Sequence, residues 1–156
     1  MKVLYAASEA LPFIASGGLA DVAGSLPQAL RKRLVGCRVV MPLYDGIKQE
    51  LKDSMKFITS ISVPVAWRRQ YCGIFEARAG GVIYYLLDNQ YYFKRDSLYG
   101  FYDDAERFAF FARAILEIIP HIDFHNQTHD AHECEVYSHP DEVPNPICEH
   151  EYQIVR

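Results

Sequence analysis

Residues 15–22 constrain the fold more than any other part of the chain. Here Ser16-Gly17-Gly18 separates an apolar stretch with strand character, residues 2–8, from a segment whose apolar residues recur at helical spacing. A strand, a glycine pair and a helix in this order bring free backbone N–H groups to a helix N-terminus, where an anion or a sugar hydroxyl can bind. A tight turn that needs glycine for its backbone angles is the simpler alternative, and spacing alone favours it.

The segment after the glycine pair predicts a helix followed by a second strand. One face of this helix is expected to be buried, and Pro27 is expected to kink or break it. A strand follows at residues 37–41, so the first 42 residues predict a βαβ unit with two parallel strands. The apolar residues expected on the buried face are Leu19, Val22, Ala23, Leu26 and Leu30.

Residues 55–87 predict a change from parallel to hairpin structure. Three β-rich segments lie here, separated by Pro64, Gly73 and Gly80-Gly81, and the last of them is the continuous apolar run 81–87. The predicted fold class is therefore α/β, a Rossmann-like parallel sheet core with added β-hairpin strands.

An aromatic loop, residues 90–101, follows the last of these segments. Sugar rings stack on aromatic faces, although loop aromatics often pack against their own domain, and the sequence leaves both readings open. Asp103 begins the next helical pattern, which Pro120 ends, and with Glu106 it fits a capping box. The aromatic residues of the loop are Tyr91, Tyr92, Phe93, Tyr99 and Phe101.

Composition narrows the range of partners. A net charge of −4 argues against nucleic-acid binding, and no apolar run approaches the roughly 20 residues of a membrane span. The four cysteines are scattered without a CxxC pair, and the apolar run at residues 3–7 is too short for a secretory signal. Reduced thiols and a cytoplasmic location are expected.

Two sequence blocks carry a family resemblance. Residues 16–24, Ser-Gly-Gly-Leu-Ala-Asp-Val-Ala-Gly, and residues 99–108, Tyr-Gly-Phe-Tyr-Asp-Asp-Ala-Glu-Arg-Phe, are similar to motifs of bacterial glycogen synthases and plant starch synthases, glycosyltransferase family 5. The resemblance spans about residues 1–124 and implies the N-terminal half of a GT-B glycosyltransferase. It assigns substrate binding to Gly17, Gly18, Asp21 and Asp103, with Asp103 in the active-site cleft. The lysine of the family's glycine motif is replaced by Ala15.

The resemblance also implies a reaction. The family transfers glucose from ADP-glucose to the non-reducing end of an α-1,4-glucan without a cofactor, and this chain resembles the acceptor-side domain only. Because the second domain, the lysine and the family's His-x-Asn-Asp-Trp motif are missing, the chain alone is expected to be inactive. A non-catalytic sugar- or glucan-binding module is the alternative. Self-association through an open sheet edge is also expected.

Residues 125–156 form a distinct His-rich tail that is expected to be poorly ordered. We expect that a frameshift, a truncation or an unusual gene ending explains the abrupt loss of the family pattern. No metal site is assigned, because the spacings fit no standard zinc motif, although zinc binding through the tail remains a further alternative. The residues that could bind zinc in this alternative are His129, His132, Cys134, Cys148 and His150.

Overall fold

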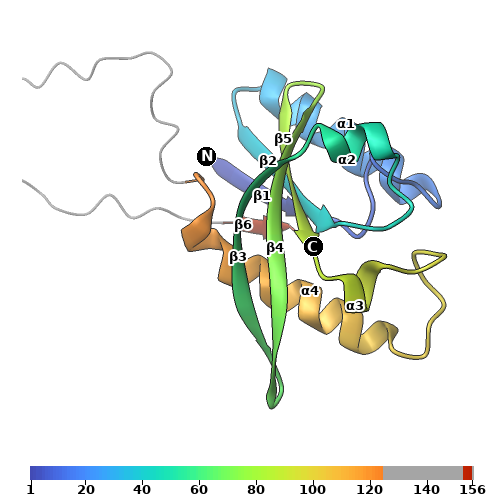
Figure 1. Cartoon of the computed structure of the whole chain (residues 1–156). Helices are drawn as coiled ribbons and strands as arrows, with labels where there is room; N and C mark the ends of the chain where they lie inside the picture. Colours follow the sequence, from blue (N-terminus) through green and yellow to red (C-terminus); the bar gives the residue numbers. More distant parts are fainter. Residues whose placement is uncertain (125–152, 156) are drawn as a thin grey trace, which may run out of the picture.

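The computed structural model describes residues 1–124 and 153–155 (Figure 1). These residues form one sheet with the strand order β3-β4-β5-β2-β1-β6, covered by helices. The strands are β1 (Lys2–Ala6), β2 (Gly36–Pro42), β3 (Lys56–Val65), β4 (Arg68–Ala79), β5 (Val82–Asp88) and β6 (Gln153–Val155). The helices are α1 (Gly18–Lys32), α2 (Gln49–Asp53), α3 (Gln90–Phe93), α4 (Asp104–Ile118) and the 3-10 turn Ile119–His121.

The central strands confirm the predicted parallel core. β2 pairs in parallel with β1 on one side and with β5 on the other. The apolar run that the sequence placed in this region forms β5, which is buried along nearly its whole length. Parallel strands are buried on both faces when helices cover the sheet, which explains why this strand is apolar throughout rather than alternating.

The other half of the sheet is antiparallel, as the predicted hairpins require. β3 pairs with β4, and β4 pairs with β5 across the turn Gly80-Gly81, where both residues have positive φ. Two glycines suit the type of two-residue turn that joins twisted strands. Pro64 and Gly73 lie inside β3 and β4, so the prediction that they separate strands was wrong. Pro64 is tolerated because β3 is the edge strand of the sheet.

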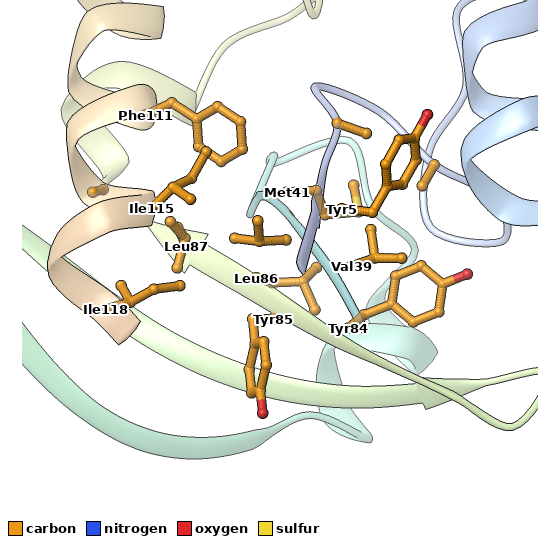
Figure 2. Packing of buried hydrophobic residues seen from close by; sticks show 14 of the residues in the cluster. Tyr5, Val39, Met41, Tyr84, Tyr85, Leu86, Leu87, Phe111, Ile115 and Ile118 are labelled. Carbon is orange, nitrogen blue, oxygen red and sulfur yellow. The ribbon is translucent and has the colours of Figure 1, made fainter. Parts of the chain in front are cut away.

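Helices α1 and α4 lie on opposite faces of the sheet (Figure 1). Figure 2 shows Phe111, Ile115 and Ile118 of α4 beside Leu87, whereas Tyr84 points to the other side. Neighbouring residues of a strand point to opposite faces, so β5 contributes alternately to two packed layers.

The buried face of α1 differs in part from the one the sequence predicted: Ala23 is buried and Leu30 is partly buried against the core, as predicted, but the other three residues are not. Leu19, Val22 and Leu26 are 45%, 51% and 38% exposed. Pro27 is buried, and the helix continues through it without the predicted break. The helix approaches the sheet through small side chains because Gly24 lies directly against the backbone of Leu11. The buried residues of α1 are Ala20, Ala23, Gly24 and Pro27.

Two cysteines lie in the core on different halves of the sheet. Cys37 in β2 and Cys72 in β4 are buried free thiols. Burial raises the pKa of Cys37 to about 11 and that of Cys72 to about 12. Both therefore remain protonated thiols at neutral pH.

The edge beyond β1 carries the short strand β6. Val3, Leu4 and Tyr5 pair in parallel with the three residues of β6, so the edge that was expected to be open is partly covered. Apart from these three residues, the predicted tail domain and its proposed metal ligands lie outside the described residues. Among the described helices, none is long and apolar enough to cross a membrane.

Candidate sugar-binding site

The candidate site lies where the parallel strands end. The carboxyl ends of β1, β2 and β5 meet at one edge of the sheet, and ligands of open α/β sheets bind at this edge. Ser8 and Glu9 follow β1, Tyr44 follows β2, and Asn89 follows β5. The glycine segment, residues 16–18, reaches the same edge because it connects β1 to α1.

The glycine segment presents free backbone to solvent. Gly17 is the N-cap residue of α1 and has an extended backbone, and no side chain caps the helix. A Cβ atom added at Gly17 or Gly18 would meet nothing within 4 Å. The first N–H groups of a helix have no partner inside it, so they are available to a hydroxyl or an anion.

A buried carboxylate fixes the approach to this segment. Glu9 is buried, and its Oε2 accepts a hydrogen bond of 2.5 Å from the Ser16 N–H. A bond from an amide N–H to a carboxylate is stronger than one between neutral groups, so it holds the loop before the glycine pair against β1.

Asp21 lies away from the glycine pair. Its exposed side chain lines a hollow of about 680 Å³ beside α1, whose walls include Leu11, Gln28 and Gly80 but neither Gly17 nor Gly18. The structure therefore places Asp21 on one flank of α1, facing the β4–β5 turn.

Tyr99 connects the aromatic loop to the glycine segment. Its hydroxyl lies 2.7 Å from Ser8 Oγ, although the two residues are 91 positions apart. Burial raises the pKa of Tyr99, hydrogen bonds with Ser8 and Ser16 lower it, and the charge of Glu9 raises it. The net shift is upward, so Tyr99 keeps its proton at neutral pH and can donate it in a hydrogen bond.

Arg107 holds the aromatic loop through hydrogen bonds to its backbone carbonyls. Its side chain is fully buried; Nε donates to the Tyr92 carbonyl at 2.7 Å and Nη1 to the Leu98 carbonyl at 3.2 Å. Nη1 also lies 2.5 Å from Asp104 Oδ1, and the guanidinium lies over the ring of Phe101, 4.9 Å from its centroid. One arginine thus connects both ends of the loop with the first turn of α4.

Asp104 continues this network into the loop backbone. Its Oδ2 accepts hydrogen bonds from the N–H groups of Gly100 and Phe101 at 2.8 and 3.2 Å. Desolvation raises the pKa of Asp104, but these bonds and Arg107 outweigh it, so the pKa lies below its ordinary value.

Asp103 pairs inside the loop and does not form the predicted capping box. It is the N-cap residue of α4 but makes no side-chain cap, and its Oδ2 accepts a 2.8 Å hydrogen bond from Arg95. Glu106 instead bonds the Tyr92 hydroxyl at 2.5 Å and pairs with Arg68. Asp103 Oδ1 is buried and has no hydrogen-bond partner among the described residues.

The loop aromatics divide between the two roles that the sequence left open. Tyr92 and Phe93 are fully buried in the core, in the short helix α3. Tyr91 and Tyr99 are exposed to solvent and Phe101 is partly buried, so the two tyrosines are the most accessible aromatic rings of the loop.

Polar groups converge beneath the edge of the sheet. Burial raises the pKa of Tyr44; Tyr99, Glu9 and Asp104 raise it further, and Arg107 lowers it. Within the described residues, Tyr44 Oη and Arg107 Nη2 are buried and without a hydrogen-bond partner. Buried polar groups are normally paired, so these two atoms are unusual in a core.

The structure therefore joins some predicted site residues and separates others. The glycine pair shares one edge of the sheet with Tyr99, whereas Asp21 faces a different hollow and Asp103 is paired with Arg95. Sequence reasoning missed Glu9 and Arg107. A charged residue just beyond the first strand, and an arginine inside an apolar helix, were the signals for them.

Comparison with known proteins agrees with these features. The family described as the starch synthase catalytic domain matches residues 2–134. Glycogen synthases of Geobacillus thermodenitrificans and Geobacillus stearothermophilus are each 59% identical over 124 residues, and that of Bacillus cereus strain B4264 is 56% identical. Each match covers 80% of this chain and 26% of the relative, so the chain spans about a quarter of the length of these relatives.

A solved structure shows the same fold. The catalytic domain of starch synthase IV from Arabidopsis thaliana, bound to ADP and acarbose, aligns with a TM-score of 0.69 and 26% identity. The alignment covers 76% of this chain and 25% of that chain.

Fold and site together define a Rossmann-like α/β domain of the GT-B glycosyltransferase class. The chain belongs to the starch synthase catalytic domain family, which its match over most of its length shows. The resemblance predicted from the glycine motif and the Asp103 block is confirmed.

Proposed function

We propose that this chain is the acceptor-side, N-terminal part of a glycogen synthase. The complete enzyme transfers glucose from ADP-glucose to the non-reducing end of an α-1,4-glucan, and this chain alone binds glucan without turnover. The observation that carries the proposal is the 59% identity to a glycogen synthase over 124 residues, together with the family match over residues 2–134, which include the whole candidate site.

The geometry supports an acceptor role. The open backbone at Gly17 and Gly18 offers N–H donors to sugar hydroxyls, and the hydroxyl of the exposed Tyr99 reaches Ser8 at the same edge of the sheet. Asp103 has an Oδ1 without a hydrogen-bond partner among the described residues, although this atom is buried, and Asp21 lines the hollow on the flank of α1. Ring stacking with a few placed polar groups is the usual means of recognising a sugar.

The same geometry explains the proposed lack of turnover. Glucosyl transfer leaves a negatively charged nucleotide, and electrostatic stabilisation of developing charge is usually the largest contribution to such a reaction. Ala15 supplies no cation beside the glycine pair, and the buried guanidinium of Arg107 is already held by carbonyls and Asp104.

The test combines a binding and a transfer assay. Affinity electrophoresis through gels containing glycogen measures retardation of the chain, and labelled ADP-glucose measures transfer. We expect retardation that is weaker in Tyr99→Ala and unchanged in Tyr71→Ala, and no transfer. Tyr71 is a suitable control because it is 51% exposed, against 37% for Tyr99. Absence of retardation overturns glucan binding. Transfer by the chain alone overturns the proposed inactivity.

A further inference from the structure

A hollow of about 440 Å³ lies at the end of the sheet opposite the candidate sugar site. The strands that line it are β1, β2 and β5, which run in parallel and begin there. Because β2 has seven residues, its two ends are about 23 Å apart at 3.3 Å per residue. A small ligand in this hollow is therefore separate from a sugar at the carboxyl ends of the strands. The strand residues that line the hollow are Lys2, Gly36, Cys37, Arg38 and Ile83.

Arg38 brings a buried positive charge to this hollow. It is 5% exposed, and its Nη1 donates a hydrogen bond to the hydroxyl of Tyr85. The guanidinium lies 5.7 Å from the ring centroid of Tyr85 and 5.4 Å from that of Phe124. Burial raises the pKa of Tyr85 more than Arg38 lowers it, so the tyrosine stays neutral at pH 7. The rings attract the guanidinium, but they do not neutralise its charge.

Arg31 adds a second positive charge. It is an exposed residue in the last turn of α1 and lines the same hollow. Its charge lowers the pKa of the Cys37 thiol against the larger opposite effect of burial, which shows that the guanidinium acts on this part of the sheet. Within the described part of the chain, neither Arg31 nor Arg38 forms an ion pair with a carboxylate.

Two acids lie near this region without lining the hollow. The charges of Glu76 and Asp123 both act on Tyr85, and Glu76 forms an ion pair with Arg78. Burial of a cation is costly unless an anion pairs with it. Two arginines that line one hollow without a carboxylate therefore favour an anionic ligand.

Charge and shape together indicate the class of anion. A phosphate monoester carries about 1.5 to 2 negative charges at pH 7, whereas a carboxylate carries one, and phosphate oxygens match the planar guanidinium. The hollow is larger than an inorganic ion requires and lies within the range of small-molecule sites, roughly 300–1,000 Å³. Its apolar wall is formed by Leu34, Val35 and Ile83.

We propose that this hollow binds a small organic phosphate. Arg31 and Arg38 hold the phosphate group, and the apolar wall contacts the rest of the molecule. The inference goes beyond the proposed function, because it uses no residue of the candidate sugar site.

NMR titration of the full ¹⁵N-labelled chain tests this site. The probe is phenyl phosphate, which contains an apolar ring and a phosphate group but neither a sugar nor a nucleotide. We expect the amide signals of Gly36, Cys37 and Ile83 to shift with a saturable dependence on concentration. The signals of Gly17 and Gly18 should not change. Absence of saturable shifts, or shifts only at the glycine pair, overturns the inference.

Charge-removing variants show whether the two arginines hold the phosphate. Arg31→Gln should weaken binding about tenfold, because a hydrogen bond to a charged group contributes about this factor to affinity. The control is Arg33→Gln, an exposed arginine two residues further on that does not line the hollow, and it should change binding less than about twofold. Equal weakening by both variants shows attraction to general surface charge and overturns the inference.

Arg38→Gln tests the buried charge, and circular dichroism checks that this variant folds. We expect a loss of affinity at least as large as that of Arg31→Gln, since its guanidinium is the less hydrated of the two. Unchanged affinity in a folded Arg38→Gln chain overturns the inference. If this variant does not fold, the comparison of Arg31→Gln with Arg33→Gln decides.

Two further probes test the class of ligand. Benzoate keeps the ring but carries one negative charge, and inorganic phosphate keeps the charge but has no apolar body. Both should bind at least about fivefold more weakly than phenyl phosphate, and equal binding of either overturns the assignment to an organic phosphate. Retardation by glycogen is a separate result: its absence leaves the phosphate site standing, and absence of phenyl phosphate binding leaves the glucan proposal standing.

Discussion

The two walls of the candidate site are built in different ways. The aromatic loop is held by a buried arginine that bonds two of its carbonyls and an acid of α4, whereas the glycine pair Gly17-Gly18 is open, with nothing within 4 Å of where a Cβ atom would stand. The difference teaches that the loop depends on internal structure, while the glycine pair is free to meet a ligand.

The largest effect should come from Arg107. Arg107→Ala removes three hydrogen bonds and leaves Asp104 without its partner, so we expect a loss of about 3 kcal/mol in the free energy of unfolding. Arg113→Ala, which removes an exposed pair with Glu117, should lose no more than about 0.5 kcal/mol. Urea unfolding measures both, and equal losses would show that the loop does not depend on Arg107.

Gly24 tests close packing of α1, because it lies against Leu11, whereas Gly18 in the same helix has open space around it. A Cβ atom in Gly24→Ala would lie 2.9 Å from the Leu11 carbonyl oxygen, so the backbone must shift. We expect a net loss of about 1 kcal/mol, because overpacking outweighs the better helix propensity of alanine. Thermal unfolding checks this, with Ser25→Ala at the exposed neighbouring position as control. A more stable Gly24→Ala would contradict the close contact.

The pH dependence of stability tests the bonds of Asp104. Its pKa is lowered in the folded chain, so its contribution is present above the unfolded value of about 3.9 and is lost as pH falls through the folded value. Urea midpoints measured from pH 6 to pH 2 should therefore fall less steeply in Asp104→Asn than in the wild type. Equal slopes would show that the carboxylate is not stabilised by the loop N–H groups.

The smallest effect on stability should come from Gly17. Its backbone is extended and its surroundings are empty, so Gly17→Ala should stay within about 0.5 kcal/mol of the wild type. Retardation by glycogen should decrease, because a methyl group then stands where the ligand approaches the backbone. A loss of stability above about 1 kcal/mol would mean that the segment is a structural turn, the simpler alternative from the sequence.

Much of the fold was predictable because it depends on periodicity. The parallel pair β1 and β2, the hairpins and the buried run of β5 all follow from apolar patterning and turn residues. The buried face of α1 was not predictable in this way. Its large apolar residues suggested one face, but close approach to Leu11 selected the small residues of another.

The site was predictable only in part, for a related reason. The glycine pair follows a strand, so its place at the edge of the sheet is a local property. The pairing of Asp103 with Arg95, and of Glu106 with Arg68 and Tyr92, depends on how the loop folds back on α4. A capping box matches residue types, but it does not show which partners compete for the same carboxylate.

The alkylation rates of the two core thiols report how often each half of the sheet opens to solvent. Cys37 lies in the parallel half and Cys72 in the antiparallel half, and alkylation of either requires that its strand open to solvent. Mass spectrometry of the peptides that carry each cysteine distinguishes the two alkylation rates. These rates therefore report the opening of the parallel half and of the antiparallel half of the sheet independently. A partner that covers β1 would slow the first rate and leave the second nearly unchanged.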